Sequence, residues 1–265
     1  MSAQTCLLLA LALYAVGMSH ALVQILTRRR AFAAWTLIAT LVGFAVHTAS
    51  LSQRWTEAGH FPAVGLHDGA SFLAWATVLV FLATYLRTRV DALGLAVFPS
   101  VFGLALLAAL TPPHPRTDPL LNSVFLPVHA SLAFLGFAAL FVAFATGVLY
   151  LIQERELKAH SPRRFYYLAP SLETCDRISG DSGTIGFSFL TLAIITGAFF
   201  NHSAHGQYFS GSAKEWSALL AWGIYIGLIV ARHQSGWGGR RGAQLGIAGF
   251  AAVVLTFLML SGFGR

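Results

Sequence analysis

Charged residues are scarce in this chain of 265 residues. Lys, Arg, Asp and Glu together make up 10% of it, whereas hydrophobic residues make up 56%. A soluble domain carries about 25% charged residues, so this chain has too few to cover a water-facing surface of its own size. Disorder is excluded by the 21 Phe, 7 Tyr and 6 Trp, because so many buriable side chains favour folding. The composition therefore predicts an integral membrane protein.

Cysteine is nearly absent as well. The two cysteines, Cys6 and Cys175, lie on opposite sides of the membrane in the topology predicted below, which argues against a disulfide between them. The sequence contains no CxxC, CxxCH or HExxH motif, so it indicates neither a thioredoxin-type redox protein, nor a covalent haem carrier, nor a zinc protease.

Eight apolar runs dominate the chain. A spanning helix needs about 20 apolar residues, and lipid cannot satisfy open backbone groups, so each run is predicted to be a transmembrane helix. The runs cover about residues 4–27, 31–52, 69–86, 92–111, 123–153, 184–202, 214–231 and 243–262. The predicted fold is all-α, a polytopic membrane protein with one integral-membrane domain over residues 1–265. No basic residues precede its first run and no small-residue cleavage site follows it, so we interpret this run as a retained helix.

Basic residues fall in alternate loops. One set of loops holds thirteen Lys and Arg, and the other set, together with the tails, holds four. The positive-inside rule places the first set in the cytoplasm and predicts that both termini face outward. The longest cytoplasmic loop is then 154–183, predicted to lie along the inner headgroups. This topology explains the net charge of +7, and no nucleic-acid partner is predicted.

Asp and Glu are absent from the middle of every apolar run, whereas histidine is present there. His47 lies five residues before the outer end of its run, and His129 lies six residues after the outer end of another. At 1.5 Å per residue both side chains would lie about 8–9 Å below the outer boundary. Neutral imidazole is a strong ligand for haem iron. We therefore expect His47 and His129 to be metal ligands that clamp one haem, although each could instead only donate a hydrogen bond inside the bundle.

Other residues are candidates of lower rank. His202, at the outer end of its run, is a reserve haem ligand, and Trp55 and Trp75 could form a shelf for the macrocycle. An inner site at His20 and His233 stays open. Most other histidines at outer loops or outer helix ends, His60 and His67 among them, are expected to be solvated.

A resemblance to a known family rests on short segments that occur in order along most of the chain. They are Val46-His47-Thr48, Arg54-Trp55, Gly59-His60-Phe61-Pro62, Val128-His129, Gly147-Val148-Leu149-Tyr150-Leu151, Gly236-Trp237 and Arg240-Arg241. In this order the chain resembles the cytochrome c assembly family of the CcsA type, and it is most similar to the small YpjD-like and HemX-like relatives. The histidine at His129 matches a haem-linked histidine of the family, and His47 matches a family position.

The chain also departs from the pattern of the cytochrome c synthases in this family. Their Trp-rich loop corresponds here to residues 205–215, where its Trp, Asp and Pro positions are replaced. Their second external histidine corresponds to Phe263 or a neighbour, and their membrane histidine to Val230. The resemblance therefore implies haem binding or handling in the bacterial inner membrane, linked to cytochrome c maturation. It does not imply that this chain alone attaches haem to apocytochrome.

The leading hypothesis is thus a membrane protein that holds b-type haem without a covalent bond, binding or transferring it rather than acting as an enzyme. Its partners would be cytochrome c maturation or haem-biosynthesis proteins. Three alternatives stay open: a scaffold or regulator that acts through the 154–183 loop without its own haem, a transporter of a small molecule or quinone, and a haem electron carrier. An internal repeat, the usual mark of a transporter, is not evident.

Overall fold

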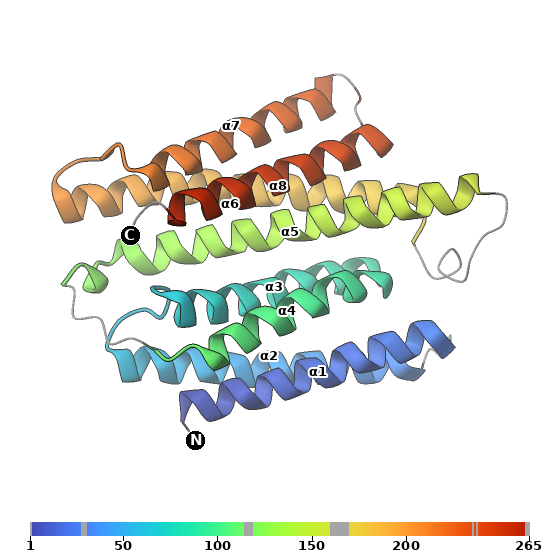
Figure 1. Cartoon of the computed structure of the whole chain (residues 1–265), viewed down its shortest axis with the longest axis horizontal. Coiled ribbons are helices and arrows are strands. Elements are labelled where there is room, and N and C mark those ends of the chain that lie inside the picture. Colours follow the sequence, from blue (N-terminus) through green and yellow to red (C-terminus); the bar gives the residue numbers. More distant parts are fainter. Residues whose placement is uncertain are drawn as a thin grey trace. The chain divides into compact units, whose positions relative to one another are not determined.

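The computed structural model describes residues 2–27, 31–113, 119–159, 170–234, 236 and 238–262. Within these ranges the chain forms eight α-helices and one short 3-10 helix (Figure 1). The helices are α1 (Ala3–Thr27), α2 (Ala31–Ala58), α3 (Leu66–Thr88), α4 (Ala92–Leu110), η1 (Pro119–Asn122), α5 (Phe125–Lys158), α6 (Leu172–His205), α7 (Ala213–Gln234) and α8 (Gly239–Gly262).

Seven of these helices, α1 to α7, are long and apolar enough to cross a membrane, counted over the described residues. The predicted all-α class is confirmed, and the helices are those of a polytopic membrane protein. Each of the eight apolar runs corresponds to one helix. The outward position of both termini stays a prediction.

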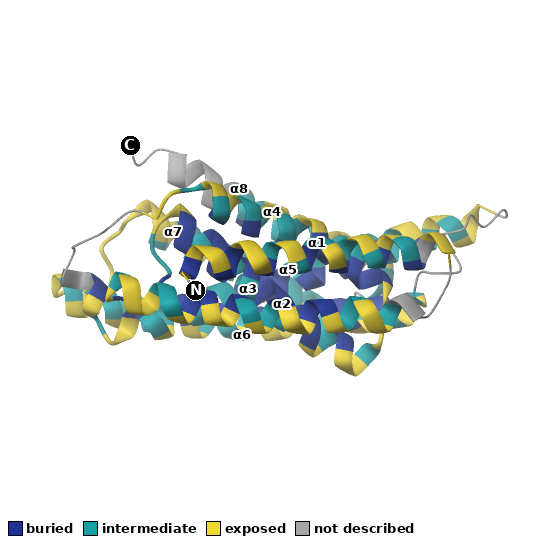
Figure 2. Ribbon diagram, turned by 90° about the horizontal axis from the view of Figure 1, so that it is seen from below, coloured by how far each residue is buried: buried dark blue, intermediate teal, exposed yellow. Residues whose placement is uncertain are grey.

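The chain forms two compact units within the domain predicted over residues 1–265. Unit 1 comprises Met1–Asn122 and unit 2 comprises Ser123–Arg265. In unit 1, α1 packs against α2 and α4, and α3 packs against α4 and α2. In unit 2, α5 packs against α6 and α8, and α7 packs against α8 and α6. Along each helix, buried and exposed residues alternate with the helical turn, so each helix has a buried and an exposed side (Figure 2).

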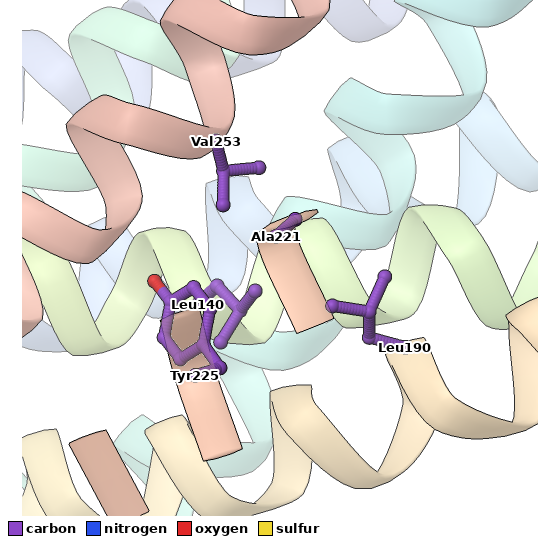
Figure 3. Packing of buried hydrophobic residues seen from close by; sticks show 5 residues of the cluster. All are labelled: Leu140, Leu190, Ala221, Tyr225 and Val253. Carbon is purple, nitrogen blue, oxygen red and sulfur yellow. The ribbon is translucent and has the colours of Figure 1, made fainter. Parts of the chain in front are cut away.

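Unit 2 has a core to which all four of its helices contribute. The cluster consists of Leu140 from α5, Leu190 from α6, Ala221 and Tyr225 from α7, and Val253 from α8 (Figure 3). All five are at most 6% exposed. In unit 1 a smaller cluster joins Leu7 of α1, Ala70 of α3 and Ala108 of α4.

Helix α2 extends six residues beyond its apolar run, to Ala58. The extension carries polar side chains that find partners within unit 1. Arg54 forms an ion pair with Asp68 of α3 at 2.9 Å, and Glu57 Oε1 accepts a hydrogen bond from the backbone N–H of Ala3 at 3.3 Å. The apolar run predicted too early an end for this helix, because hydropathy does not show that partners within the protein satisfy its polar side chains.

Helix α6 begins at Leu172, twelve residues before its apolar run. Ser171 caps its N-terminus by accepting a hydrogen bond from the N–H of Thr174 at 3.2 Å. Asp176 forms an ion pair with Arg232 of α7 at 3.0 Å, and the Ser179 hydroxyl donates to the carbonyl of Ala143 in α5 at 3.0 Å. These partners explain why a polar segment is helical here.

The segment 154–183 consequently differs from the long loop that the sequence predicts. Its first residues belong to α5, which continues to Lys158, and residues 172–183 belong to α6. The Lys158 ammonium and Glu154, one turn apart, are paired at 2.7 Å, which supports the end of α5. Residues 160–169, including Arg163 and Arg164, lie outside the described residues, as do residues 28–30.

Glycines allow α5 and α6 to approach closely. A Cβ atom added at Gly186 would lie 2.7 Å from the Leu140 Cδ2 atom and 3.0 Å from the Leu140 backbone nitrogen. A Cβ at Gly136 would lie 3.3 Å from the carbonyl oxygen of Gly186. Small residues at a helix crossing let the backbones meet, and in lipid this packing is a main source of helix association.

We predict that Gly186→Ala lowers the stability of unit 2 by about 1–3 kcal/mol, because the methyl group overpacks the crossing against α5 backbone that cannot withdraw. The measurement is the thermal unfolding midpoint of the purified protein in detergent. Gly183→Ala is the matched control, since a Cβ there meets only the Ala143 Cβ atom at 3.9 Å. Equal midpoints for the two variants would contradict the role given to Gly186.

Candidate functional site

His47 is fully buried in unit 1, and both of its ring nitrogens take part in hydrogen bonds. Nδ1 lies 3.2 Å from the hydroxyl of Tyr14 in α1, and Nε2 lies 3.0 Å from the hydroxyl of Ser71 in α3. A neutral imidazole has one donor and one acceptor nitrogen, so this pair of hydroxyls satisfies the ring in either tautomer. To bind iron, His47 would have to give up one of these bonds.

Trp55 and Trp75, the two tryptophans expected to flank a macrocycle, belong to one aromatic chain in unit 1. The Trp55 ring contacts Phe61 edge-on with centroids 5.1 Å apart. Phe61 contacts Phe72 at 5.3 Å, and Phe72 contacts Trp75 at 5.3 Å. The Trp75 indole N–H donates to Thr48 Oγ1 at 2.9 Å. The structure therefore joins the two tryptophans through phenylalanines that sequence reasoning did not single out.

His60 and His67 were expected to be solvated, and both are buried at 8% exposure. His67 lies in the first turn of α3, where its Nδ1 donates to the carbonyls of Ala108 and Thr111 at 2.8 and 2.9 Å. Its neighbour Asp68 is held by Arg54 as described above. These contacts fix the start of α3 beside the aromatic chain. The expectation was wrong because the sequence does not show the backbone carbonyls at the end of α4.

His129 lies four residues after Phe125, where α5 begins. Its Nδ1 donates to the carbonyl oxygen of Ala193 in α6 at 2.8 Å. Its ring lies against Gly197, and it is parallel to the Phe200 ring within 3°, with centroids 6.5 Å apart. Because Nδ1 is the donor, Nε2 keeps its lone pair, and no described residue provides a hydrogen bond to it.

The equal depth of His47 and His129 does not follow from the helix ends. Helix α2 continues eleven residues beyond His47, to Ala58, whereas His129 is four residues from the start of α5. The two histidines therefore lie at different distances from the ends of their helices. The similarity of depth rests on the apolar runs alone, because the polar end of α2 adds helix that hydropathy does not count.

His202 lies in the last turn of α6 and is exposed. Its ring stacks on Tyr208, with centroids 4.2 Å apart and planes within 8°. Gly206 ends the helix with φ at 73°, and its N–H donates to the His202 carbonyl at 2.8 Å. Neither ring nitrogen of His202 has a hydrogen bond to a described residue.

The loop between α6 and α7 is organised by Glu215. Its Oε2 accepts hydrogen bonds from the N–H and the hydroxyl of Ser210, both at 2.9 Å, and from the N–H of Ser212 at 3.2 Å. Its Oε1 accepts from the side-chain amide of Asn201 in α6 at 3.1 Å. Sequence reasoning missed this role, although an acidic residue two positions into a helix is a common signal of such capping.

The possible inner site at His20 and His233 stays a prediction. His233 is exposed at the end of α7, and its Nδ1 donates to the Ile229 carbonyl of its own helix at 2.9 Å. Among the described residues as a whole, no three or more His, Cys, Asp or Glu side chains form a group that could hold a metal ion. Trp237 of the Gly-Trp segment and Phe263 lie outside the described residues.

The candidate site residues thus divide between the units. In unit 1 the structure brings Trp55 and Trp75 into one aromatic chain, and His47 is held in its own hydrogen-bond network. In unit 2, His129 and His202 lie on neighbouring helices, α5 and α6. The His129 ring is oriented by Ala193, and its Nε2 atom has no hydrogen bond to a described residue.

Comparison with known proteins gives a consistent result. The family model described as "Cytochrome C assembly protein" matches residues 4–263. The chain is 29% identical over 248 residues to "Cytochrome c biogenesis protein CcsA" of Guillardia theta, covering 85% of this chain and 82% of that one. It is 30% identical over 266 residues to the protein of the same name from Microcystis aeruginosa, covering 82% of this chain and 81% of that one.

A solved structure shares the fold. "Cytochrome c Heme Lyase CcmF" matches with a TM-score of 0.73 and 17% sequence identity, over 97% of this chain but only 47% of that one. The chain therefore spans about half the length of that protein, and the likeness concerns the fold alone. The family match over nearly the whole sequence, on a frame of apolar helices, establishes that the chain belongs to the cytochrome c assembly protein family, of the CcsA type.

Proposed function

We propose that this protein binds and handles haem for cytochrome c biogenesis in the bacterial inner membrane. The proposal draws on the family, on the names of the CcsA relatives, and on one structural observation. That observation is His129, whose Nδ1 is committed to a backbone carbonyl while Nε2 is available as a ligand atom. Metal-binding histidines in proteins usually have this arrangement. Bound haem would supply an iron that accepts imidazole and changes between ferrous and ferric forms.

The haem would be of the b type and non-covalent, since the chain contains no CxxCH motif. Binding and transfer, rather than attachment to apocytochrome by this chain alone, is the role proposed here. The partners would be other cytochrome c maturation proteins or haem-biosynthesis proteins.

Two histidines are candidates for a second residue that would hold the haem. The pairing of His47 with His129, expected from the sequence, requires His47 to release Tyr14 or Ser71. His202 requires no such loss, because neither of its ring nitrogens is engaged by a described residue. The Tyr208 ring stacks on the His202 ring and would hold this imidazole in place as a ligand.

The first test is the absorption spectrum and the pyridine haemochrome of protein purified in mild detergent. We expect a Soret band in the wild type and its loss, or a shift to a high-spin form, in His129→Ala. If His47 is the second ligand, His47→Gln changes the spectrum and His202→Ala does not; the opposite result assigns the position to His202.

A control keeps this test independent of folding. His233→Ala removes an exposed imidazole that bonds only to its own helix, and we expect it to retain the wild-type spectrum. A wild-type protein without any Soret band after reconstitution with haem would refute the proposal and favour the scaffold alternative.

The loop between α6 and α7 offers a second test, because it occupies the position of the Trp-rich loop of the family. We propose that Glu215 holds this loop in shape beside His202. In Glu215→Ala the amides of Ser210 and Ser212 lose a charged acceptor worth about 1.5–3 kcal/mol. We therefore expect their hydrogen exchange to accelerate by roughly tenfold or more.

Hydrogen exchange measured by mass spectrometry on peptides that cover 206–213 provides the readout. Lys214→Ala is the matched control, since its side chain is exposed and neighbours Glu215 in sequence. Exchange that stays at the wild-type rate in Glu215→Ala would contradict the role of Glu215.

A further inference from the structure

We infer that Gly197 and the backbone carbonyl of Ala193 form a seat for His129 that sets its tautomer, so that both residues of α6 act as positioning residues. The seat is a property of unit 2 alone. Its consequence for haem rests on the function proposed above.

The first part of the seat is chemical. A backbone carbonyl oxygen can only accept a hydrogen bond, so the 2.8 Å contact between the His129 Nδ1 and the Ala193 oxygen requires a proton on Nδ1. In the neutral ring the lone pair then resides on Nε2. The Thr196 hydroxyl lies 3.1 Å from the same Ala193 oxygen, but its shorter hydrogen bond, at 2.8 Å, is to the carbonyl of Leu192.

The second part is steric. A Cβ atom at Gly197 would lie 2.8 Å from the His129 Cε1 atom and 2.9 Å from its Nδ1 atom. Both distances are below those that real side chains tolerate, so the ring occupies the space that a side chain at position 197 would fill. The ring cannot move away from such a side chain without lengthening its bond to Ala193.

The third part is the helical register. Residues 193, 197 and 200 are spaced by four and three, so they share one face of α6. Along this face Ala193 supplies the acceptor, Gly197 supplies the space, and Phe200 supplies a ring parallel to the imidazole within 3°. One stripe of α6 thereby determines both the orientation and the tautomer of a side chain on α5.

This arrangement would matter for a ligand because an imidazole with a fixed tautomer binds a metal without first reorganising. Residues that orient a ligating histidine typically contribute about 10- to 100-fold to metal affinity. In Gly197→Ala we therefore expect haem affinity to fall by about this factor, with an altered spectrum, while His129 itself is unchanged.

The decisive test does not need haem. Protein labelled with 15N-histidine, in detergent at mildly alkaline pH, reports the tautomer of each neutral imidazole by NMR, and the His129 signal is assigned by its loss in His129→Gln. We expect the Nδ1–H form for His129 in the wild type and loss of that signature in Gly197→Ala. Gly223→Ala is the matched control, because a Cβ there meets no atom within 4 Å, and it should retain the wild-type signal.

An Nε2–H tautomer of His129 in the wild type would overturn the inference, and so would an unchanged signal in Gly197→Ala. The wild-type measurement keeps the inference falsifiable even if that variant does not fold. The two proposals fail separately. A protein that shows the Nδ1–H form but binds no haem would refute the haem function only. A protein that binds haem but shows His129 with its proton on Nε2 would refute the seat only, because that tautomer cannot donate to the Ala193 carbonyl.

Discussion

The structure depends on one constraint: a polar group at membrane depth needs a partner inside the protein. Lipid offers no hydrogen bonds, so an unpaired group costs several kcal/mol. Each unit also contains an ion pair between helices just outside its apolar runs, Arg54 with Asp68 in unit 1 and Arg232 with Asp176 in unit 2. These pairs allow α2 and α6 to continue through polar sequence, and the extension of α2 carries Trp55.

The same constraint explains how far the fold could be predicted. The number of helices and their order follow from apolar runs, since a run of sufficient length has no stable alternative in lipid. The C-terminal end of α2 and the N-terminal end of α6 cannot be predicted from the apolar runs. Hydropathy treats Arg54 and Asp176 as water-exposed, because it contains no information on their ion pairs with Asp68 and Arg232. Only the cap at Ser171, followed by Glu173 in the first turn, gave a local signal of the true start of α6.

The candidate site shows a similar limit. Sequence reasoning selected His47 and His129 by residue type and position, which are properties of the single residue. Whether an imidazole can accept a ligand depends on its partners, and these come from other helices: Tyr14 and Ser71 occupy both nitrogens of His47, whereas Ala193 occupies only one nitrogen of His129. Two histidines that look equivalent along the chain therefore differ in chemical state.

The hydrogen bonds of the two histidines also determine which of them can accept a ligand. A buried histidine with hydrogen bonds at both ring nitrogens, such as His47, stabilises its unit. Its presence alone therefore does not indicate a ligand site. A histidine with one nitrogen held by a backbone carbonyl can offer the other nitrogen to a ligand, and here the absence of a side chain at Gly197 accommodates the ring. The His129 ring fills the space that a side chain at Gly197 would take, so the position of this histidine depends on a glycine of the neighbouring helix.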